Sequence, residues 1–306
     1  MLWLCGSNYT KIVMRYLKLL LVSFAILFSS IDGSAQKKKT KKNDENPIAS
    51  ALKSFKFRSV GPAFMSGRIA DIAIDETNEN VWYVAVGSGG VWKTENAGTT
   101  WNPIADNMPF YSTGCITIDP SNNSSIWLGT GENVGGRHVG IGHGVYHSSD
   151  AGKSWKNMGL KNSEHVSKII VHPNNSNVIW VAAQGPLWSS GGDRGLFKSV
   201  DGGKTWENKL EINEWTGVTD LVINPENPNI LYLASWQRHR NVAALMDGGP
   251  GTALYKSVDG GENWKKINNG LPGSNMGKIG LAISPMKPNV LYAAIELDRR
   301  EGAVYK

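Results

Sequence analysis

The sequence has very little cysteine. Only Cys5 and Cys115 occur in 306 residues. Cys5 lies in an N-terminal segment that we expect to be removed on export, so a disulfide within the mature chain is excluded. Cys115 begins an apolar stretch, 115–118. We therefore expect a buried structural thiol there rather than a nucleophile.

A basic surface is also missing from the part that should fold. The formal net charge is +6, but eight of the 32 basic residues and one of the 26 acidic residues lie before residue 43. Residues 43–306 therefore carry 24 basic and 25 acidic side chains. Nucleic-acid binding needs clustered Lys and Arg on the fold itself. Nucleic acid is excluded as a main partner.

Motifs for metals and nucleotides are absent. His138 and His143 lie close in sequence, but no neighbouring cysteine or carboxylate completes a zinc set. The glycine-rich stretches 87–90 and 191–192 are typical of turns rather than phosphate loops. We predict neither a metal nor a cofactor.

Long hydrophobic runs are missing except near the N-terminus. Residues 14–18 form a short basic segment, and residues 19–28 are almost wholly apolar. Small residues follow at Gly33, Ser34 and Ala35. This order predicts a signal peptide over 1–35, with an uncleaved anchor as the alternative. A Lys-rich linker over 36–47 follows, and then a folded domain over 48–306. We expect an exported protein with no stable membrane span after signal cleavage.

The 3.6-residue period of amphipathic helices is absent after this segment, and an internal repeat takes its place. An eight-residue pattern, Ser/Thr-x-Asp-x-Gly-x-x-Trp, occurs four times, with Asn replacing Asp in the first copy. The Trp-to-Trp spacings are 54, 51 and 58 residues. The copies are 94–101, 148–155, 199–206 and 257–264, and their defining residues are Asn96 and Trp101, Asp150 and Trp155, Asp201 and Trp206, and Asp259 and Trp264.

A second pattern runs in phase with the first. An apolar run, a polar turn and another apolar run precede each copy, as in 115–118, 119–125 and 126–128. Four short strands in about 50 residues predict one blade of a β-propeller. The fold class is therefore all-β, with four complete four-stranded blades and part of a fifth, because 302–306 resembles the approach to another copy of the motif. The ring is incomplete in this chain, and we expect a missing C-terminal part to supply the remaining blades.

The eight-residue motif resembles the Asp-box of bacterial-neuraminidase-repeat (BNR) propellers. That resemblance implies that the motif joins the third and fourth strands of each blade. Its Asp can accept backbone N–H bonds within the turn, its Gly permits a positive φ, and its Trp can pack on neighbouring strands. We interpret the motif residues as structural rather than catalytic.

Variable loops should lie at the opposite rim, because the second–third and fourth–first connections of an up-and-down blade share one end. Binding residues concentrate on variable loops of rigid scaffolds. Arg, Trp and carboxylates suit peptide or glycan recognition. The predicted binding residues at this rim are Glu132, Arg137, His138, Trp188, Asp193, Arg194, Trp236, Arg238 and Arg240; solvated charges that pair with one another are the alternative.

The stretches 57–62, 86–93, 129–133 and 183–188 resemble secreted bacterial sortilin-like and repeat-containing glycosyl hydrolase proteins. Sortilin-type propellers bind peptides and proteins, which implies a protein, peptide or carbohydrate ligand. Xyloglucanase-type hydrolases are the enzymatic alternative. Their catalytic Asp would fall at Gly87, which has no titratable group, and Glu132 is interpreted as the equivalent of that position in the next blade. Glu132 is thus the one catalytic candidate.

Sialidases share the Asp-box as well, but they need an Arg trio, and only Arg58 and Arg68 are weak candidates. The sequence therefore favours an exported binding propeller over a glycoside hydrolase whose active site a missing C-terminal part completes.

Overall fold

The computed structural model describes residues 68–298 and 302–306, all within one unit that spans 63–306. The described residues form β-strands joined by turns and loops, without an α-helix. A helix able to cross a membrane is therefore not found in this part of the chain. The predicted signal peptide, the Lys-rich linker and Arg58 lie outside the described residues.

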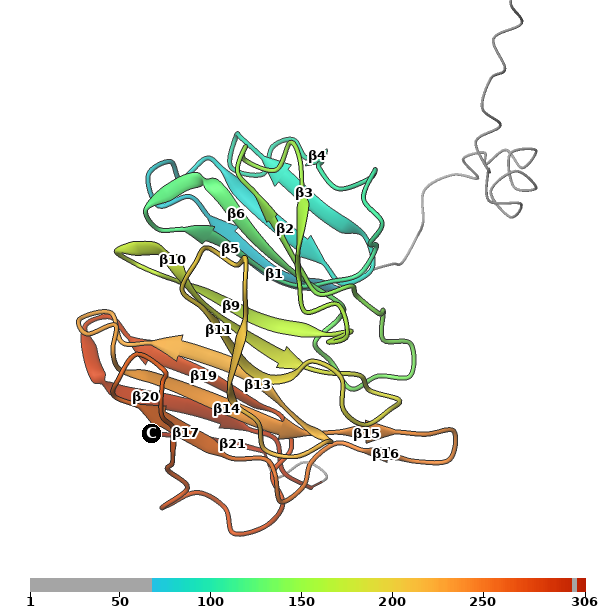
Figure 1. The fold of residues 1–306 in the computed structure, drawn as a ribbon, viewed down its shortest axis with the longest axis vertical. Coiled ribbons are helices and arrows are strands. Elements are labelled where there is room, and N and C mark those ends of the chain that lie inside the picture. Colours follow the sequence, from blue (N-terminus) through green and yellow to red (C-terminus); the bar gives the residue numbers. More distant parts are fainter. Residues whose placement is uncertain (1–67, 299–301) are drawn as a thin grey trace, which may run out of the picture. The chain divides into compact units, whose positions relative to one another are not determined.

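The strands follow one another as antiparallel meanders (Figure 1). The strands are β1 (Ile69–Ile74), β2 (Trp82–Val86), β3 (Gly90–Thr94), β4 (Asn102–Pro103), β5 (Thr113–Asp119), β6 (Asn122–Thr130), β7 (Val145–Ser148), β8 (Lys156–Gly159), β9 (Val166–His172), β10 (Asn175–Gln184), β11 (Arg194–Ser199), β12 (Glu207–Leu210), β13 (Thr216–Ile223), β14 (Leu231–Gln237), β15 (His239–Arg240), β16 (Leu245–Met246), β17 (Leu254–Ser257), β18 (Lys265–Lys266), β19 (Ile279–Ser284), β20 (Lys287–Ile295) and β21 (Ala303–Tyr305).

These strands build five consecutive propeller blades. Blades 1 to 3 are β1–β4, β5–β8 and β9–β12. Blade 4 pairs β13, β14, β17 and β18, and blade 5 contains β19, β20 and β21. The predicted four complete blades and partial fifth are confirmed. A hairpin, β15–β16, lies in the second–third connection of blade 4, which the sequence analysis treated as a variable loop.

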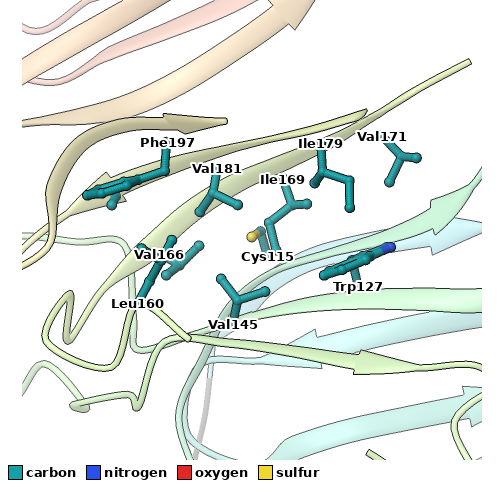
Figure 2. Close-up of a cluster of buried hydrophobic side chains, with 11 residues drawn as sticks. Cys115, Trp127, Val145, Leu160, Val166, Ile169, Val171, Ile179, Val181 and Phe197 are labelled. Carbon is teal, nitrogen blue, oxygen red and sulfur yellow. The ribbon is translucent and has the colours of Figure 1, made fainter. Parts of the chain in front are cut away.

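The core lies between neighbouring blades rather than inside any one sheet. Successive residues of a strand point to opposite faces, and the second strands of the internal blades 2 to 4 are buried on both. In β6, Ile126 and Leu128 pack with residues of blade 1, whereas Trp127 packs with residues of blade 3. Figure 2 shows the cluster that contains Trp127, in which Cys115 is fully buried. Burial raises the pKa of the Cys115 thiol, as expected for a structural cysteine.

Each Asp-box is a hydrogen-bonded turn between the third and fourth strands. In the second box the Asp150 carboxylate accepts bonds from Ser154 N at 2.8 Å and from the Ser148 hydroxyl at 2.7 Å. The Trp155 indole N–H donates to Ile104 O of the preceding blade at 3.0 Å. The Trp206 indole repeats this contact on Met158 O at 2.7 Å. The second and third boxes therefore close their own turns and also tie one blade to the previous one, whereas the Trp264 indole of the fourth box donates to Gly261 O of the same box.

The lowered pKa values of the Asp-box carboxylates predict that the fold loses stability in acid. Hydrogen bonds, led by those of Ser154 and of Thr205, lower the pKa of Asp150 and of Asp201 from 3.8 to about 2. Because their pKa is lower in the folded state, they stabilise the fold above about pH 4, and this contribution disappears as the pH falls towards 2.

We expect the double variant Asp150→Asn, Asp201→Asn to show a flatter fall of melting temperature between pH 4 and pH 2 than the parent. Asparagine suits the test because Asn96 already occupies this place in the first box, where its Oδ1 accepts from Thr100 N at 2.8 Å. Thermal melts at several pH values measure the effect, and an unchanged slope would contradict it.

The first and last blades expose faces that the internal blades bury. Ile72 in β1 is 50% exposed, whereas its counterpart in β5, Ile116, is 3% exposed. In blade 5, Tyr292 is 40% exposed, whereas Trp180 at the same place in blade 3 is 1% exposed. Both faces therefore have the composition of a blade–blade interface.

Candidate binding site

The loops that differ between blades lie at the end of the sheets opposite the Asp-boxes. Antiparallel order places every second–third connection at this end, which we call the loop rim. Its second–third loops in blades 1 to 4 are 87–89, 131–144, 185–193 and 238–253. Figure 1 shows the β15–β16 hairpin extending beyond the strands of its own sheet. The rim is therefore shaped mainly by blades 2, 3 and 4.

Glu132, the catalytic candidate, is buried and fully engaged. Its carboxylate accepts two bonds from Arg68 Nη2, at 2.6 and 2.7 Å, and one from Arg68 Nε at 3.1 Å. Gly140 N donates to Oε2 at 2.9 Å. The Glu132 side chain is 3% exposed and that of Arg68 is 58% exposed. This ion pair fixes the start of the loop 131–144 and leaves the carboxylate no open face.

The strand register corrects the equivalence between Gly87 and Glu132. Gly87 N donates to Arg68 O, and Gly131 N makes the matching bond to Ser112 O. Gly131, not Glu132, therefore stands at the place of Gly87. The Glu132 carboxylate nevertheless lies against Gly87, where a Cβ would collide with Oε1. A side chain at position 87 and the Glu132 carboxylate cannot occupy this space together.

Residues 133–135, which we call the strap, are held by cations of blades 4 and 5. Their three carbonyl oxygens accept in turn from Lys278 Nζ, from Arg238 Nη1 at 2.7 Å and from Arg240 Nη1 at 3.5 Å. Asn133 Nδ2 also donates to Gly114 O at 3.2 Å. The strap thus links blade 2 to blades 4 and 5 across the loop rim.

Trp236 lies beneath these cations. The guanidinium carbon of Arg238 is 5.1 Å from its ring and the Lys278 ammonium is 5.5 Å away. Burial, together with the Arg238 charge, lowers the pKa of Lys278 to about 8. The Asp247 carboxylate packs on Gly135, and burial and the charge of Glu296 raise its pKa. The cations around Trp236 thus bond to backbone oxygens of the strap.

Arg194 holds the next loop in the same way. Its guanidinium donates to Gln184 O and Pro186 O, both at 2.6 Å, and to Gly191 O at 3.2 Å. Gly185 leaves room for the guanidinium, since a Cβ there would lie 2.7 Å from Arg194 Cζ. Arg194 therefore fixes the loop 185–193, which presents Trp188.

An open cavity lies where the strap meets the hairpin. Its volume is about 340 Å³, and it is lined by Gly135, Gly136, Arg137, Arg240 and residues 242–245. Trp188 lies beside it, because the Arg240 guanidinium carbon is 5.7 Å from the Trp188 ring. Trp188 is 47% exposed. An exposed aromatic face, two arginines and an apolar wall thus come together on the loop rim.

The predicted binding residues divide into two groups. Arg137, His138 and Trp188 are exposed, and half-buried Asp193 accepts from Asn162 N at 2.9 Å. The buried group, whose contacts hold loops in place, consists of Glu132, Arg194, Trp236, Arg238 and Arg240. Sequence reasoning missed Lys278 as a strap-holding residue, although a lysine beside the apolar strand 279–283 was a usable signal.

A second cavity of about 230 Å³ lies between the first strands of the blades and includes Asp71, Lys168, Asp220 and Lys278. Both carboxylates already bond to the next blade, Asp71 to Ile116 N at 3.1 Å and Asp220 to Leu281 N at 2.7 Å. These bonds indicate a role in blade packing. In the described part of the chain, no group of His, Cys, Asp and Glu could hold a metal ion.

Comparisons with known proteins agree with this architecture. The family described as "Sortilin, neurotensin receptor 3" matches residues 143–290. The GH74 xyloglucanase from Xanthomonas campestris superposes with a TM-score of 0.57 at 18% identity, over 78% of this chain and 36% of that one. This likeness supports the β-propeller fold of the present chain. The GH74 enzyme of Niastella koreensis gives a TM-score of 0.51 at 18% identity, over 76% of this chain and 37% of that one.

Curated relatives of the propeller are longer proteins. A probable oligoxyloglucan-reducing end-specific xyloglucanase of Neosartorya fischeri is 23% identical over 234 residues, which are 70% of this chain and 25% of that protein. Xyloglucanase Xgh74A of Acetivibrio thermocellus is 21% identical over 242 residues, 68% of this chain and 26% of that protein. The chain thus spans about a quarter of the length of these relatives.

Proposed function

We propose that this chain belongs to an exported propeller protein whose loop rim binds an extended glycan or peptide. The observation that carries the proposal is the exposed Trp188 beside the 340 Å³ cavity. Tryptophan and arginine are enriched among the residues that contribute most to binding energy at interfaces. The xyloglucanase names of the relatives support a carbohydrate ligand, and the sortilin match supports a protein or peptide.

A matched pair of tryptophans tests this proposal. Trp188 lies on the loop rim, and Trp101, 37% exposed, lies in an Asp-box at the opposite rim. On glycan and peptide arrays we expect Trp188→Ala to weaken binding about tenfold, the effect of a central aromatic contact. Trp101→Ala should change it less than twofold. Equal losses in both variants, or a loss only in Trp101→Ala, would contradict binding at the loop rim.

Export is part of the proposal, on the basis of the N-terminal sequence. Cleavage after Ala35 would give a mature chain that starts at Gln36. N-terminal sequencing of the exported protein tests this, and a retained N-terminal segment would favour the uncleaved anchor.

The second candidate function is glycoside hydrolysis, supported by the xyloglucanase relatives. Glycoside hydrolysis needs two carboxyl groups, one as acid and one as base or nucleophile. Glu132 is engaged by Arg68, so this candidate needs carboxylates from blades beyond these 306 residues. Release of reducing sugar from xyloglucan by a protein that includes such blades, with Glu132 intact or replaced by Gln, would favour hydrolysis over binding alone. The binding proposal expects no release.

A further inference from the structure

The cavity between the strap and the hairpin has a one-sided charge. Two arginines, Arg137 and Arg240, line it, and the other lining residues are glycine, alanine, valine and leucine. The neighbouring Asp247 is not a lining residue and forms no ion pair with either arginine within residues 68–298. The charged side chains that line this cavity are therefore both cationic, and the other lining side chains are apolar or absent.

Arg240 is buried, yet most of its donors are unused. The residue is 7% exposed, and its guanidinium makes one long bond, from Nη1 to Gly135 O at 3.5 Å. Nε and Nη2 find no protein acceptor in the described part of the chain, but they are not among the atoms sealed from solvent. These donors are therefore accessible to solvent, on a residue that lines the cavity. The backbone bond from Arg240 N to Leu187 O fixes the main chain here, and the Trp188 ring lies 5.7 Å from the guanidinium carbon.

We propose that this cavity binds the carboxylate of a uronic acid unit in an acidic polysaccharide, with Arg240 and Arg137 as the cationic partners. The inference rests on the proposed function of the loop rim and names its ligand class. A guanidinium with two free, parallel donors matches a carboxylate in a bidentate arrangement. A cavity of about 340 Å³ lies within the range of small-ligand sites.

The surroundings favour a sugar as the carrier of this carboxylate. The half-exposed Trp188 ring next to Arg240 offers a flat apolar face of the kind that packs against a pyranose ring. The hairpin turn adds the aliphatic side chains of Val242 and Leu245. The cavity thus combines arginine donors for a carboxylate with an apolar surface for the sugar ring.

A pair of polymers that differ only in charge tests the inference. Polygalacturonate and its carboxyl-reduced form share a backbone, and affinity electrophoresis or calorimetry with the 306-residue chain compares their binding. We expect polygalacturonate to bind at least tenfold more tightly, with an affinity that falls as the salt concentration rises. Equal binding of both polymers would overturn the carboxylate assignment while leaving glycan binding at the loop rim intact. Failure of every glycan and peptide to bind would instead contradict the proposed function.

Matched variants locate the effect. Arg137→Gln removes an exposed charge without disturbing the core, and we expect polygalacturonate binding to weaken at least fivefold. Arg240→Gln should weaken it at least tenfold, whereas Lys161→Gln, an exposed charge in another loop of the same rim, should have less than a twofold effect. Equal losses in Arg137→Gln and Lys161→Gln would show general charge attraction and overturn the site. If poly-glutamate bound in an Arg137-dependent way and polygalacturonate did not bind, the assignment of a sugar as the carrier of the carboxylate would be overturned.

Discussion

Replacing Arg194 by alanine should lower the free energy of unfolding by about 3 kcal/mol and release the loop that carries Trp188. The change leaves two buried carbonyl oxygens, those of Gln184 and Pro186, and two part-buried ones without this donor, and it opens a cavity beside Gly185. Each orphaned buried group costs about 1–3 kcal/mol, and loss of the side chain adds a cavity cost. Arg194 has no ion-pair partner in the described residues, so relief of a buried charge offsets part of this sum.

Chemical denaturation measures the stability loss, and array binding measures its consequence for Trp188. The matched control is Arg137→Ala, because Arg137 is exposed and should change stability by less than about 0.5 kcal/mol. If Arg194 instead contacted ligand directly, Arg194→Ala would abolish binding at unchanged stability. That outcome would contradict its role as the residue that positions the loop.

Substitution of Gly261 by alanine should destabilise the fold by about 2–4 kcal/mol. Gly261 in the fourth Asp-box has a φ of +83°, and a Cβ there would lie 2.7 Å from Trp180 Nε1. A left-handed conformation costs a non-glycine residue about 1–2 kcal/mol, and overpacking a buried contact costs about 1–3 kcal/mol more. The Trp180 indole, which donates to Gly260 O at 3.2 Å, would have to move.

Gly270 provides the control that separates these two causes. Its φ is +82°, but a Cβ there would meet no atom within 4 Å. Gly270→Ala should therefore show the backbone cost alone, about 1 kcal/mol. Equal losses of stability in Gly261→Ala and Gly270→Ala, measured by denaturant titration, would show that the box does not pack on the neighbouring blade.

The blades could be predicted because their determinants are local. Alternating apolar residues set each strand, and the motif 257–264 closes its own turn with bonds between residues at most four apart, such as Asn263 N to Asp259 Oδ1. The β15–β16 hairpin escaped prediction, because its turn at 241–244 depends on Asn241 Oδ1 accepting from Ala243 and Ala244 N rather than on a repeat.

The loop rim could be located from strand order, but the roles of its charges could not. Arg238 bonds to a carbonyl 104 residues away and Arg240 to one 105 residues away. Nothing in the local sequence distinguishes these buried arginines from exposed Arg137. An arginine of this rim is buried when its guanidinium reaches backbone oxygens of a distant loop. The positions of those oxygens are known only from the folded structure.

Hydrogen exchange with and without ligand is the most direct test of the loop rim as the binding face. The tightest ligand from the arrays would be added at saturating concentration, and backbone exchange would be followed by mass spectrometry. We predict slower exchange in 131–144, 185–193 and 238–246, with the Asp-boxes at 148–155, 199–206 and 257–264 unchanged. Protection confined to the Asp-boxes, with none in the three loops, would contradict the account.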